Sequence, residues 1–214
     1  MECILAFPCG KLKDMALDWR VFLDVLFPPS ADERMLRRVS AAEFALKYEP
    51  QVENGITALS PFADPHIRAA IHLAKFHRNR HALSLLGSLL SRHLASLPAL
   101  PYTLMPMPLS SQRLRARGYN QVEQVLLHAA LPEGMRRDAR ALSKADRQPQ
   151  TELTKKQRLT NQRGAFSLSD VRACKDRHIL LIDDVATTGA TLHAAAEAVA
   201  LGGPLSLTLL AIAH

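Results

Sequence analysis

The sequence predicts an α/β fold in which a central, mostly parallel sheet is flanked by helices. The main evidence is the apolar run from Ile179 to Ile182, with Val185 following an acidic pair. Such a run is typical of a strand buried on both faces of a parallel sheet. Segments with helical apolar periodicity precede and follow it. With 214 residues, 48% of them hydrophobic, the chain can form one such domain with additions.

The N-terminal 55 residues are expected to form a helical extension. Residues 18–27 (DWRVFLDVLF) place apolar side chains at helical spacing, and the two prolines that follow end this helix. The next residues are polar and charged, and they contain no pattern of metal ligands. We interpret the helix as a packing element.

The net charge and the cysteine content indicate which kinds of partner and which cellular setting suit this protein. The net charge of +7 and the pI near 9.7 favour anionic partners, either phosphates or nucleic acid, although a generic basic surface has the same composition. Cys3, Cys9 and Cys174 are too few and too scattered for a disulfide framework, which favours a reducing, cytoplasmic setting. Structural zinc needs four ligands, so we expect no zinc ligands. We expect no membrane span and no signal peptide.

Two helices are expected before the first predicted strand. Asp64 is placed to cap the first helix, which has Pro65 in its first turn. The second helix is expected over residues 79–97, where leucines recur on one face. Between them lies the strongly basic segment 75–81 (KFHRNRH). Two interpretations of this segment remain open: a turn that contacts an anion, or a solvated helix junction.

A strand over residues 102–105 is expected to end at the following prolines, because proline cannot continue a regular ladder. Residues 110–121 (SSQRLRARGYNQ) are expected to form a loop in which Gly118 adopts a conformation that other residues avoid. Guanidinium groups pair well with phosphate oxygens, so the three arginines of this loop suit a pyrophosphate. Asn120 is expected to start a helix that runs to Ala129.

The segments before and after the acidic pair complete the predicted domain. A short strand is expected over residues 139–142 and another over residues 166–168. Between them, the polar segment 147–164 is longer than an ordinary connection, as in a lid or a disordered loop. A helix follows the acidic pair, two glycines end it, and residues 205–212 form the last buried strand.

The stretch from His178 to Thr191 (HILLIDDVATTGAT) carries the candidate chemistry. Asp183 and Asp184 follow the buried strand, and carboxylates there can accept hydrogen bonds from the vicinal hydroxyls of a ribose. The small hydroxylated loop that follows presents backbone N–H groups at a helix start, where an anion is favoured. The alternative is an ordinary helix capped by Thr188 with solvated aspartates.

This stretch resembles the 5-phosphoribosyl-1-pyrophosphate (PRPP) signature of the type I phosphoribosyltransferases. A second motif, RGYNQ at residues 117–121, resembles that of the competence protein ComF/GntX group within that class, as do LFPP at residues 26–29 and residues 56–76. The resemblance implies a type I phosphoribosyltransferase fold with a flexible hood or lid loop. It also implies that Asp183 and Asp184 are catalytic and hold the ribose hydroxyls.

The resemblance extends to other site residues. The PRPP-binding loop it implies consists of Ala186, Thr187, Thr188, Gly189, Ala190 and Thr191. The pyrophosphate loop consists of Pro108, Arg113, Arg117, Gly118, Tyr119, Asn120 and Gln121. The lid consists of Gln150, Arg158, Asn161 and Arg163, ahead of Gly164, Ala165 and Phe166. Mg²⁺ is expected to bind with PRPP.

The sequence departs from this group in one respect. The group commonly carries a four-cysteine zinc module after LFPP, whereas this chain has no cysteine between LFPP and Cys174. We therefore expect residues 1–55 to be a degenerate, zinc-free counterpart of that module, and residues 56–214 to form the phosphoribosyltransferase-type domain. The sequence does not indicate an oligomeric state.

Three functions follow from these expectations. The first is a phosphoribosyltransferase that passes phosphoribosyl from PRPP to an unidentified nitrogen acceptor and releases pyrophosphate. The second is a non-catalytic protein that associates with PRPP and single-stranded DNA and acts with the competence machinery in DNA uptake. The third is a remnant with an inactive site. Neither the acceptor nor its general base can be identified from the sequence.

Overall fold

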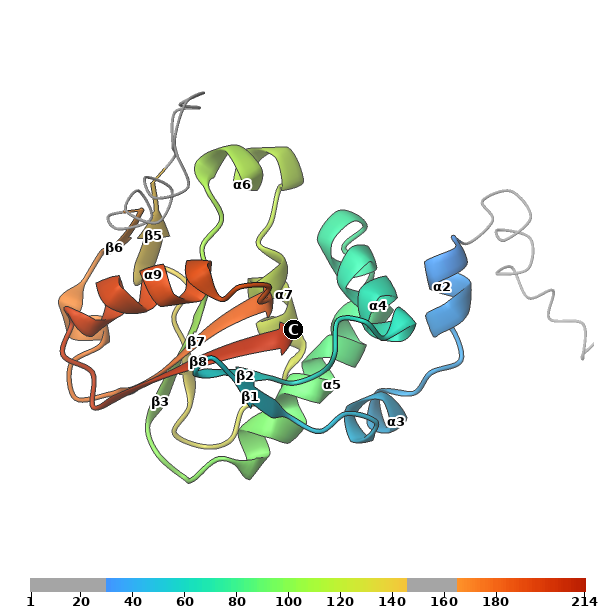
Figure 1. Cartoon of the computed structure of the whole chain (residues 1–214), viewed down its shortest axis with the longest axis horizontal. Helices are drawn as coiled ribbons and strands as arrows, with labels where there is room; N and C mark the ends of the chain where they lie inside the picture. Colours follow the sequence, from blue (N-terminus) through green and yellow to red (C-terminus); the bar gives the residue numbers. More distant parts are fainter. Residues whose placement is uncertain (1–29, 146–164) are drawn as a thin grey trace, which may run out of the picture.

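The computed structural model describes residues 30–145 and 165–214. The predicted helix over residues 18–27, Cys3, Cys9 and the segment 147–164 with its lid residues lie outside the described residues. The predicted α/β architecture is confirmed: a mostly parallel central sheet is covered by helices on both faces (Figure 1).

The main sheet has six strands in the order β1-β2-β8-β7-β3-β4. All neighbouring strands are parallel except β1 and β2. In sheet order the strands are Gln51–Glu53, Ile56–Ala58, Ser206–Ala213, His178–Val185, Tyr102–Pro106 and Arg136–Arg137. A separate antiparallel pair is formed by β5 (Leu142–Lys144) and β6 (Phe166–Leu168). The buried strand β7 thus lies near the centre of the sheet.

The sheet separates two hydrophobic clusters. Leu180 and Ile182 of β7 pack with α4, α5 and α7, whereas Ile179 and Leu181 pack with α9, β5 and β6. This alternation follows from the two-residue period of a strand. The helices are α2 (Ala31–Leu36), α3 (Ala41–Leu46), α4 (Pro65–Phe76), α5 (Arg80–Ser96), α6 (Ser111–Arg117), α7 (Gln121–His128) and α9 (Ala190–Ala200), with a 3-10 turn at Val171–Ala173.

The expected Asp64 cap is present, and the two other helices expected to start near Asn79 and at Asn120 are capped by those residues. The Asp64 side chain accepts hydrogen bonds from the N–H groups of His66 and Ile67 at the start of α4. Asn79 caps α5 and Asn120 caps α7. These helices begin where the sequence places them because Asp and Asn side chains satisfy first-turn N–H groups.

Two local expectations were wrong. Residues 110–121 are not a continuous loop, because α6 forms there between the Ser110 cap and Gly118, whose φ is 79°. The intervening residues are good helix formers, and the glycine takes the left-handed position that ends the helix. The strand expected over residues 139–142 is also absent. The Asp138 side chain accepts the N–H groups of Arg140 and Ala141 in a turn, so that β5 starts only at Leu142.

The described part of the N-terminal extension packs against the same core as the later elements. Leu36, Phe44 and Tyr48 belong to the cluster that contains α4 and α5. The extension also adds the outer strand β1 to the sheet. Among the described helices, none has the length and apolar character needed to cross a membrane.

Candidate functional site

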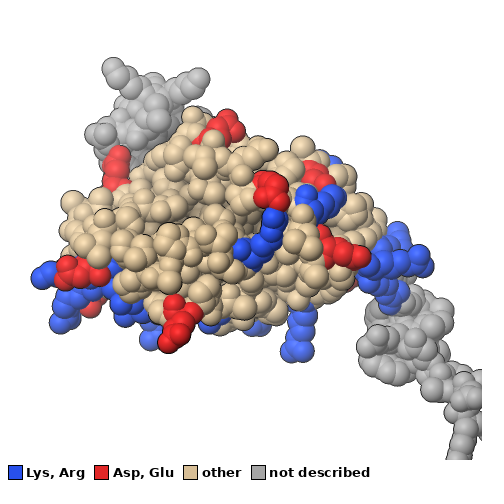
Figure 2. Space-filling view, turned by 90° about the horizontal axis from the view of Figure 1, so that it is seen from below, with Lys and Arg blue, Asp and Glu red and all other residues tan. Residues whose placement is uncertain are grey.

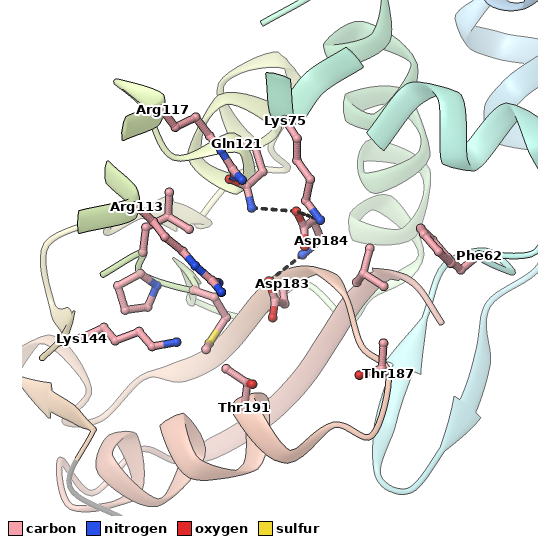
Figure 3. A pocket seen from close by; sticks show the side chains of 14 residues that line it. Phe62, Lys75, Arg113, Arg117, Gln121, Lys144, Asp183, Asp184, Thr187 and Thr191 are labelled. Carbon is pink, nitrogen blue, oxygen red and sulfur yellow. Dashed lines mark hydrogen bonds and ion pairs between the residues drawn. The ribbon is translucent and has the colours of Figure 1, made fainter. Parts of the chain in front are cut away.

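A pocket of about 380 Å³ lies where β3 and β7 end (Figure 3). Its acidic wall comes from Asp183 and Asp184 of β7. The opposing basic side chains come from three different elements: Lys75 of α4, Arg113 and Arg117 of α6, and Lys144 of β5. Clefts at the carboxyl ends of parallel strands are where open α/β sheets bind ligands.

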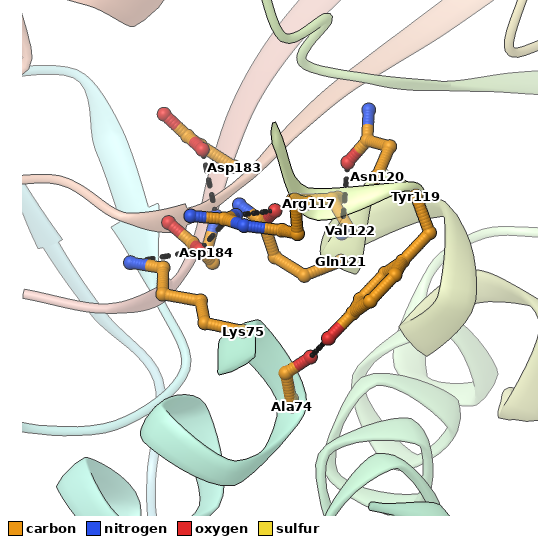
Figure 4. Close-up of polar contacts among 9 residues, drawn as sticks. All are labelled: Ala74, Lys75, Arg117, Tyr119, Asn120, Gln121, Val122, Asp183 and Asp184. Atoms are coloured by element: carbon orange, nitrogen blue, oxygen red, sulfur yellow. Dashed lines mark hydrogen bonds and ion pairs between the residues drawn. The ribbon is translucent and has the colours of Figure 1, made fainter. Parts of the chain in front are cut away.

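The two neighbouring aspartates have different surroundings (Figure 4). Asp184 is 7% exposed, and its Oδ2 lies 2.7 Å from Nε2 of Gln121 and 2.9 Å from Nζ of Lys75. Asp183 accepts a 2.8 Å hydrogen bond from the backbone N–H of Asp184, and its side chain points into the pocket (Figure 3). Asp184 is therefore held by the protein, while Asp183 faces whatever enters the pocket.

The surroundings of the pair raise the pKa of Asp183. Burial, and then the neighbouring charge of Asp184, raise the pKa of Asp183 to about 6. The positive charges of Lys75 and Lys144 act in the opposite direction. A carboxyl group with such a pKa can exchange a proton near neutral pH.

The loop after the acidic pair leads directly into α9. Thr187 and Thr191 line the pocket, whereas Ala186 is buried and donates its N–H to the carbonyl of Ala213 over 3.0 Å. The N-cap of α9 is Gly189, with a φ of 72°, so the alternative in which Thr188 is the N-cap is wrong. Thr188 Oγ1 accepts only a long 3.4 Å bond from the N–H of Ala190.

This helix start is suited to an anion. Because the N-cap is a glycine, it offers no side chain to the first-turn N–H groups, which together with the helix dipole favour negative charge. A Cβ atom on Gly189 would lie 2.3 Å from Cδ1 of the Ile56 side chain, which would have to shift, and the φ of 72° strains any other residue there. Residues 187–191 thus form a tight turn that presents hydroxyl and amide donors.

Some residues of the RGYNQ motif line the pocket, and the others fix the backbone around it. Arg117 and Gln121 line the pocket, and Arg117 donates a hydrogen bond to the Gln121 side-chain carbonyl. Gly118 ends α6. Asn120 donates to the carbonyl of Met107 over 2.9 Å while its own carbonyl caps α7. These bonds fix the loop after β3 against the start of α7.

Tyr119, the aromatic residue of the motif, holds the end of α4 (Figure 4). Its hydroxyl donates to the carbonyl of Ala74 over 2.8 Å and accepts the N–H of Arg78 over 3.0 Å. It does not line the described pocket. Among the other residues expected to bind pyrophosphate, Pro108 and Arg113 line it. The four lid residues, Gln150, Arg158, Asn161 and Arg163, lie outside the described residues.

Six pocket residues were not identified as site residues from the sequence: Phe62, Lys75, Met107, Leu109, Lys144 and Val185. Lys75 was included in the basic segment 75–81, but nothing in the composition distinguishes it from its neighbours. The structure divides that segment, since Lys75 pairs with Asp184 whereas the Arg78 guanidinium bonds Gln124. Neither of the two open interpretations describes the whole segment. Lys144 and Phe62 could not be found because only the tertiary fold brings β5 and the loop after β2 to the pocket.

The described residues do not build a protein-only metal centre. Across residues 30–145 and 165–214, no group of three or more His, Cys, Asp or Glu side chains is arranged around a common point. Both aspartates line the pocket, but Oδ2 of Asp184 already accepts hydrogen bonds from Gln121 and Lys75. Asp183 is therefore the more available carboxylate, and one carboxylate together with ligand phosphates is a common way to hold Mg²⁺. The residues thus fit a metal ion that enters with a phosphorylated ligand.

Comparisons with known proteins found a family match and a similar solved structure. Residues 128–213 match the family model described as the phosphoribosyl transferase domain, and this segment contains the acidic pair and the loop that follows it. No curated protein matches the sequence significantly. Among solved structures, a hypoxanthine phosphoribosyltransferase from Staphylococcus aureus is similar to this chain, with 16% identity and a TM-score of 0.36. The match covers 60% of this chain and 59% of that enzyme, so the chain spans about three fifths of its length. The family match is thus confined to the C-terminal part of the chain, which includes β7, α9 and β8.

Proposed function

We propose that the chain binds PRPP and transfers its phosphoribosyl group to a nitrogen acceptor with release of pyrophosphate. The observation that carries this proposal is the arrangement of one pocket. An anion-binding turn and the Asp183 carboxylate line one side, and the guanidinium groups of Arg113 and Arg117 line the other. A diphosphorylated ribose presents the matching groups in that order: a phosphate, two hydroxyls and a pyrophosphate.

Each end of the ligand has a partner of suitable chemistry. Residues 187–191 hold the 5-phosphate through backbone N–H groups and threonine hydroxyls. Asp183 accepts hydrogen bonds from the ribose diol, and Asp184 stays fixed by Gln121 and Lys75. The guanidinium groups and Lys144 hold the pyrophosphate. The reacting carbon then lies between an acidic and a basic wall.

The chemical step follows from this charge distribution. The bond between the anomeric carbon and the pyrophosphate oxygen breaks, and the pyrophosphate leaves with the electron pair. Arg113, Arg117 and Lys144 stabilise the negative charge that develops on this leaving group. The Asp183 carboxylate stabilises the positive charge on the sugar before the nitrogen acceptor forms the new bond. Mg²⁺ bound with PRPP supplies further neutralisation of the pyrophosphate.

Calorimetric titration with PRPP, with and without Mg²⁺, tests the binding proposal. Asp183→Asn should bind PRPP at least about tenfold more weakly, since a charged acceptor for the diol is lost. The matched control is Asp176→Asn on the exposed surface, which should bind normally. An Asp183→Asn variant that binds as well as the native chain would contradict the assignment.

Pyrophosphate release in the presence of a panel of nitrogen acceptors tests turnover. PRPP binding without release would favour the non-catalytic alternative associated with single-stranded DNA. On the face seen in Figure 2, basic side chains are scattered among acidic ones and form no continuous stripe.

A further inference from the structure

Lys75 occupies an unusual place for a basic residue in a phosphate pocket, because it pairs with an acid. Its Nζ lies 2.9 Å from Oδ2 of Asp184, and the two side chains are 24% and 10% exposed. The amide of Gln121 donates to the same oxygen over 2.7 Å. Two donors thus converge on Oδ2, leaving little room for another partner.

The second donor belongs to a fixed chain of contacts. Arg117 donates to the carbonyl of Gln121, which orients the Gln121 amide toward Asp184 (Figure 4). Asp184 is therefore held from two sides, by α4 through Lys75 and by α7 through Gln121. An exposed ion pair contributes little, but this one is largely removed from water and hydrogen-bonded.

Lys75 is also delivered by a fixed backbone. It lies in the last turn of α4, where a positive side chain is favoured by the helix dipole. The Tyr119 hydroxyl bonds the carbonyl of Ala74 and the N–H of Arg78 on either side of this turn. The Arg78 guanidinium stacks over the Tyr119 ring at 5.5 Å. The position of the Lys75 ammonium is thus set by the RGYNQ motif.

We propose that the Lys75 ammonium excludes a divalent cation from the acidic pair in the ligand-free protein. A metal ion bound by both carboxylates would have to occupy the position beside Asp184 that this ammonium already fills. A metal ion then enters the pocket only with a phosphorylated ligand, on Asp183 and the ligand oxygens. The identity of that ligand rests on the proposed function, whereas the pairing of Lys75 with Asp184 does not.

The physical reason is competition for carboxylate oxygens. Two adjacent carboxylates attract a divalent cation strongly when neither is neutralised, and Mg²⁺ requires oxygen ligands near octahedral geometry. With Oδ2 of Asp184 already accepting two donors, that oxygen is not open to a metal ion in the ligand-free pocket. Removing the ammonium frees that oxygen for a metal ion.

Titration of the ligand-free full chain with Mn²⁺, followed by electron paramagnetic resonance, tests the proposal. The native chain should bind Mn²⁺ weakly, and Lys75→Met should bind it at least about tenfold more tightly, a difference of about 1.4 kcal/mol. Lys75→Arg keeps a cation next to Asp184 and should stay weak. Lys144→Met removes the same charge from the same pocket without freeing Asp184, and it should stay within about twofold of the native chain.

Two results would overturn the proposal. If Lys75→Met gains no Mn²⁺ affinity, then Lys75 does not exclude the metal. If Lys144→Met gains as much, then the effect comes from pocket charge rather than from occupation of the Asp184 oxygen. Circular dichroism melting verifies that each variant folds, and Lys75→Ala replaces the methionine variant if that variant does not.

The metal titration contains no PRPP, so its outcome is separate from that of the proposed function. A chain that fails to bind PRPP can still show the gain of Mn²⁺ affinity in Lys75→Met. Conversely, if the native chain binds PRPP but Lys75→Met shows unchanged Mn²⁺ affinity, the proposal for Lys75 is rejected while the proposed function stands. A parallel PRPP titration should depend more strongly on Mg²⁺ in Lys75→Met than in the native chain.

Discussion

Asp183 and Asp184 show how two identical neighbouring residues acquire different environments. Successive side chains on a strand point to opposite faces, so Asp184 turns to the side of α4 and α7 and meets Lys75 and Gln121. Asp183 turns the other way and faces the pocket. The sequence predicts the pair and its place at the strand end. The partner that neutralises Asp184 is 109 residues earlier in the chain, and only the fold reveals it.

The raised pKa of Asp183 predicts that this carboxylate destabilises the folded protein at neutral pH. Its ordinary value is 3.8 and its value in the folded protein is about 6. The folded state therefore keeps the proton to higher pH than the unfolded state, and stability falls as the pH rises from about 4 to about 6. Asp183→Asn removes this penalty, so it should raise the melting temperature above pH 6 and give no gain below pH 4.

Thermal melts of both proteins between pH 4 and pH 8 measure this effect. Asp176→Asn on the exposed surface is the control and should show no pH-dependent gain. The same Asp183→Asn variant should lose PRPP affinity, as expected where a site is strained for function. A variant less stable than the native chain at pH 8 would show that Asp183 is a structural rather than a functional residue.

At the scale of elements, the start of α4 is set by Asp64. Burial would raise the pKa of Asp64, but the hydrogen bonds from Lys47 and the N–H of His66 outweigh it and lower the pKa to about 2. Ionised Asp64 thus contributes about 2 kcal/mol above pH 4, and the contribution is lost as the pH falls toward 2. The Asp64 side chain is 17% exposed, but its Lys47 partner is 47% exposed, so solvent partly screens the ion pair and the measured contribution should fall below this figure.

Asp64→Asn separates the ion pair from the cap, because asparagine caps a helix about as well as aspartate does. The variant should be about 1–2 kcal/mol less stable at pH 7, and the difference should shrink as the pH falls toward 3. Urea denaturation at several pH values measures it. A pH-independent loss would assign the effect to the cap instead of the charge.

Gly87 lies where α5 contacts α7, and its replacement by alanine is predicted to destabilise the protein although alanine is the better helix former. Alanine normally stabilises a helix by about 1 kcal/mol relative to glycine. At Gly87 of α5, however, a Cβ atom would lie 2.7 Å from the carbonyl oxygen of His128 at the end of α7. Gly87→Ala should therefore cost about 1–3 kcal/mol, because α7 must move.

Denaturation of Gly87→Ala measures this cost, with Ser84→Ala on the same helix as the matched control. Ser84 is partly exposed, so its replacement should be neutral or stabilising. Since α7 carries Gln121 at its first turn, the Gly87→Ala variant should also bind PRPP more weakly. An unchanged free energy of unfolding would mean that α7 can move away from α5 without destabilising the protein.

At the scale of the whole molecule, the sequence predicted the sheet better than the site. The apolar runs of β7, β3 and β8 reveal buried strands because their burial on both faces removes any need for polar positions. The short strands β1, β2 and β4 have no such signal, since their positions depend on the partners they pair with. The pocket residues Lys75 and Lys144 were missed for a similar reason, because each comes from an element far away in the sequence.

Phe44 tests whether the N-terminal extension folds with the rest of the chain. Its side chain is 1% exposed and packs edge-on against Tyr48, with the ring centroids 5.5 Å apart, in the cluster that contains α4 and α5. Phe44→Ala should lower the free energy of unfolding by about 3–5 kcal/mol.

If the extension and the later residues form one cooperative unit, far-UV circular dichroism and amide exchange in β7 should report the same loss of stability. A variant that exposes α3 while β7 keeps native protection would instead indicate an extension that unfolds on its own. In that case the Lys75–Asp184 pair and the pocket would persist, because α4, α7 and β7 would remain folded. PRPP titration of the variant therefore distinguishes an extension needed for the site from one that is only attached to it.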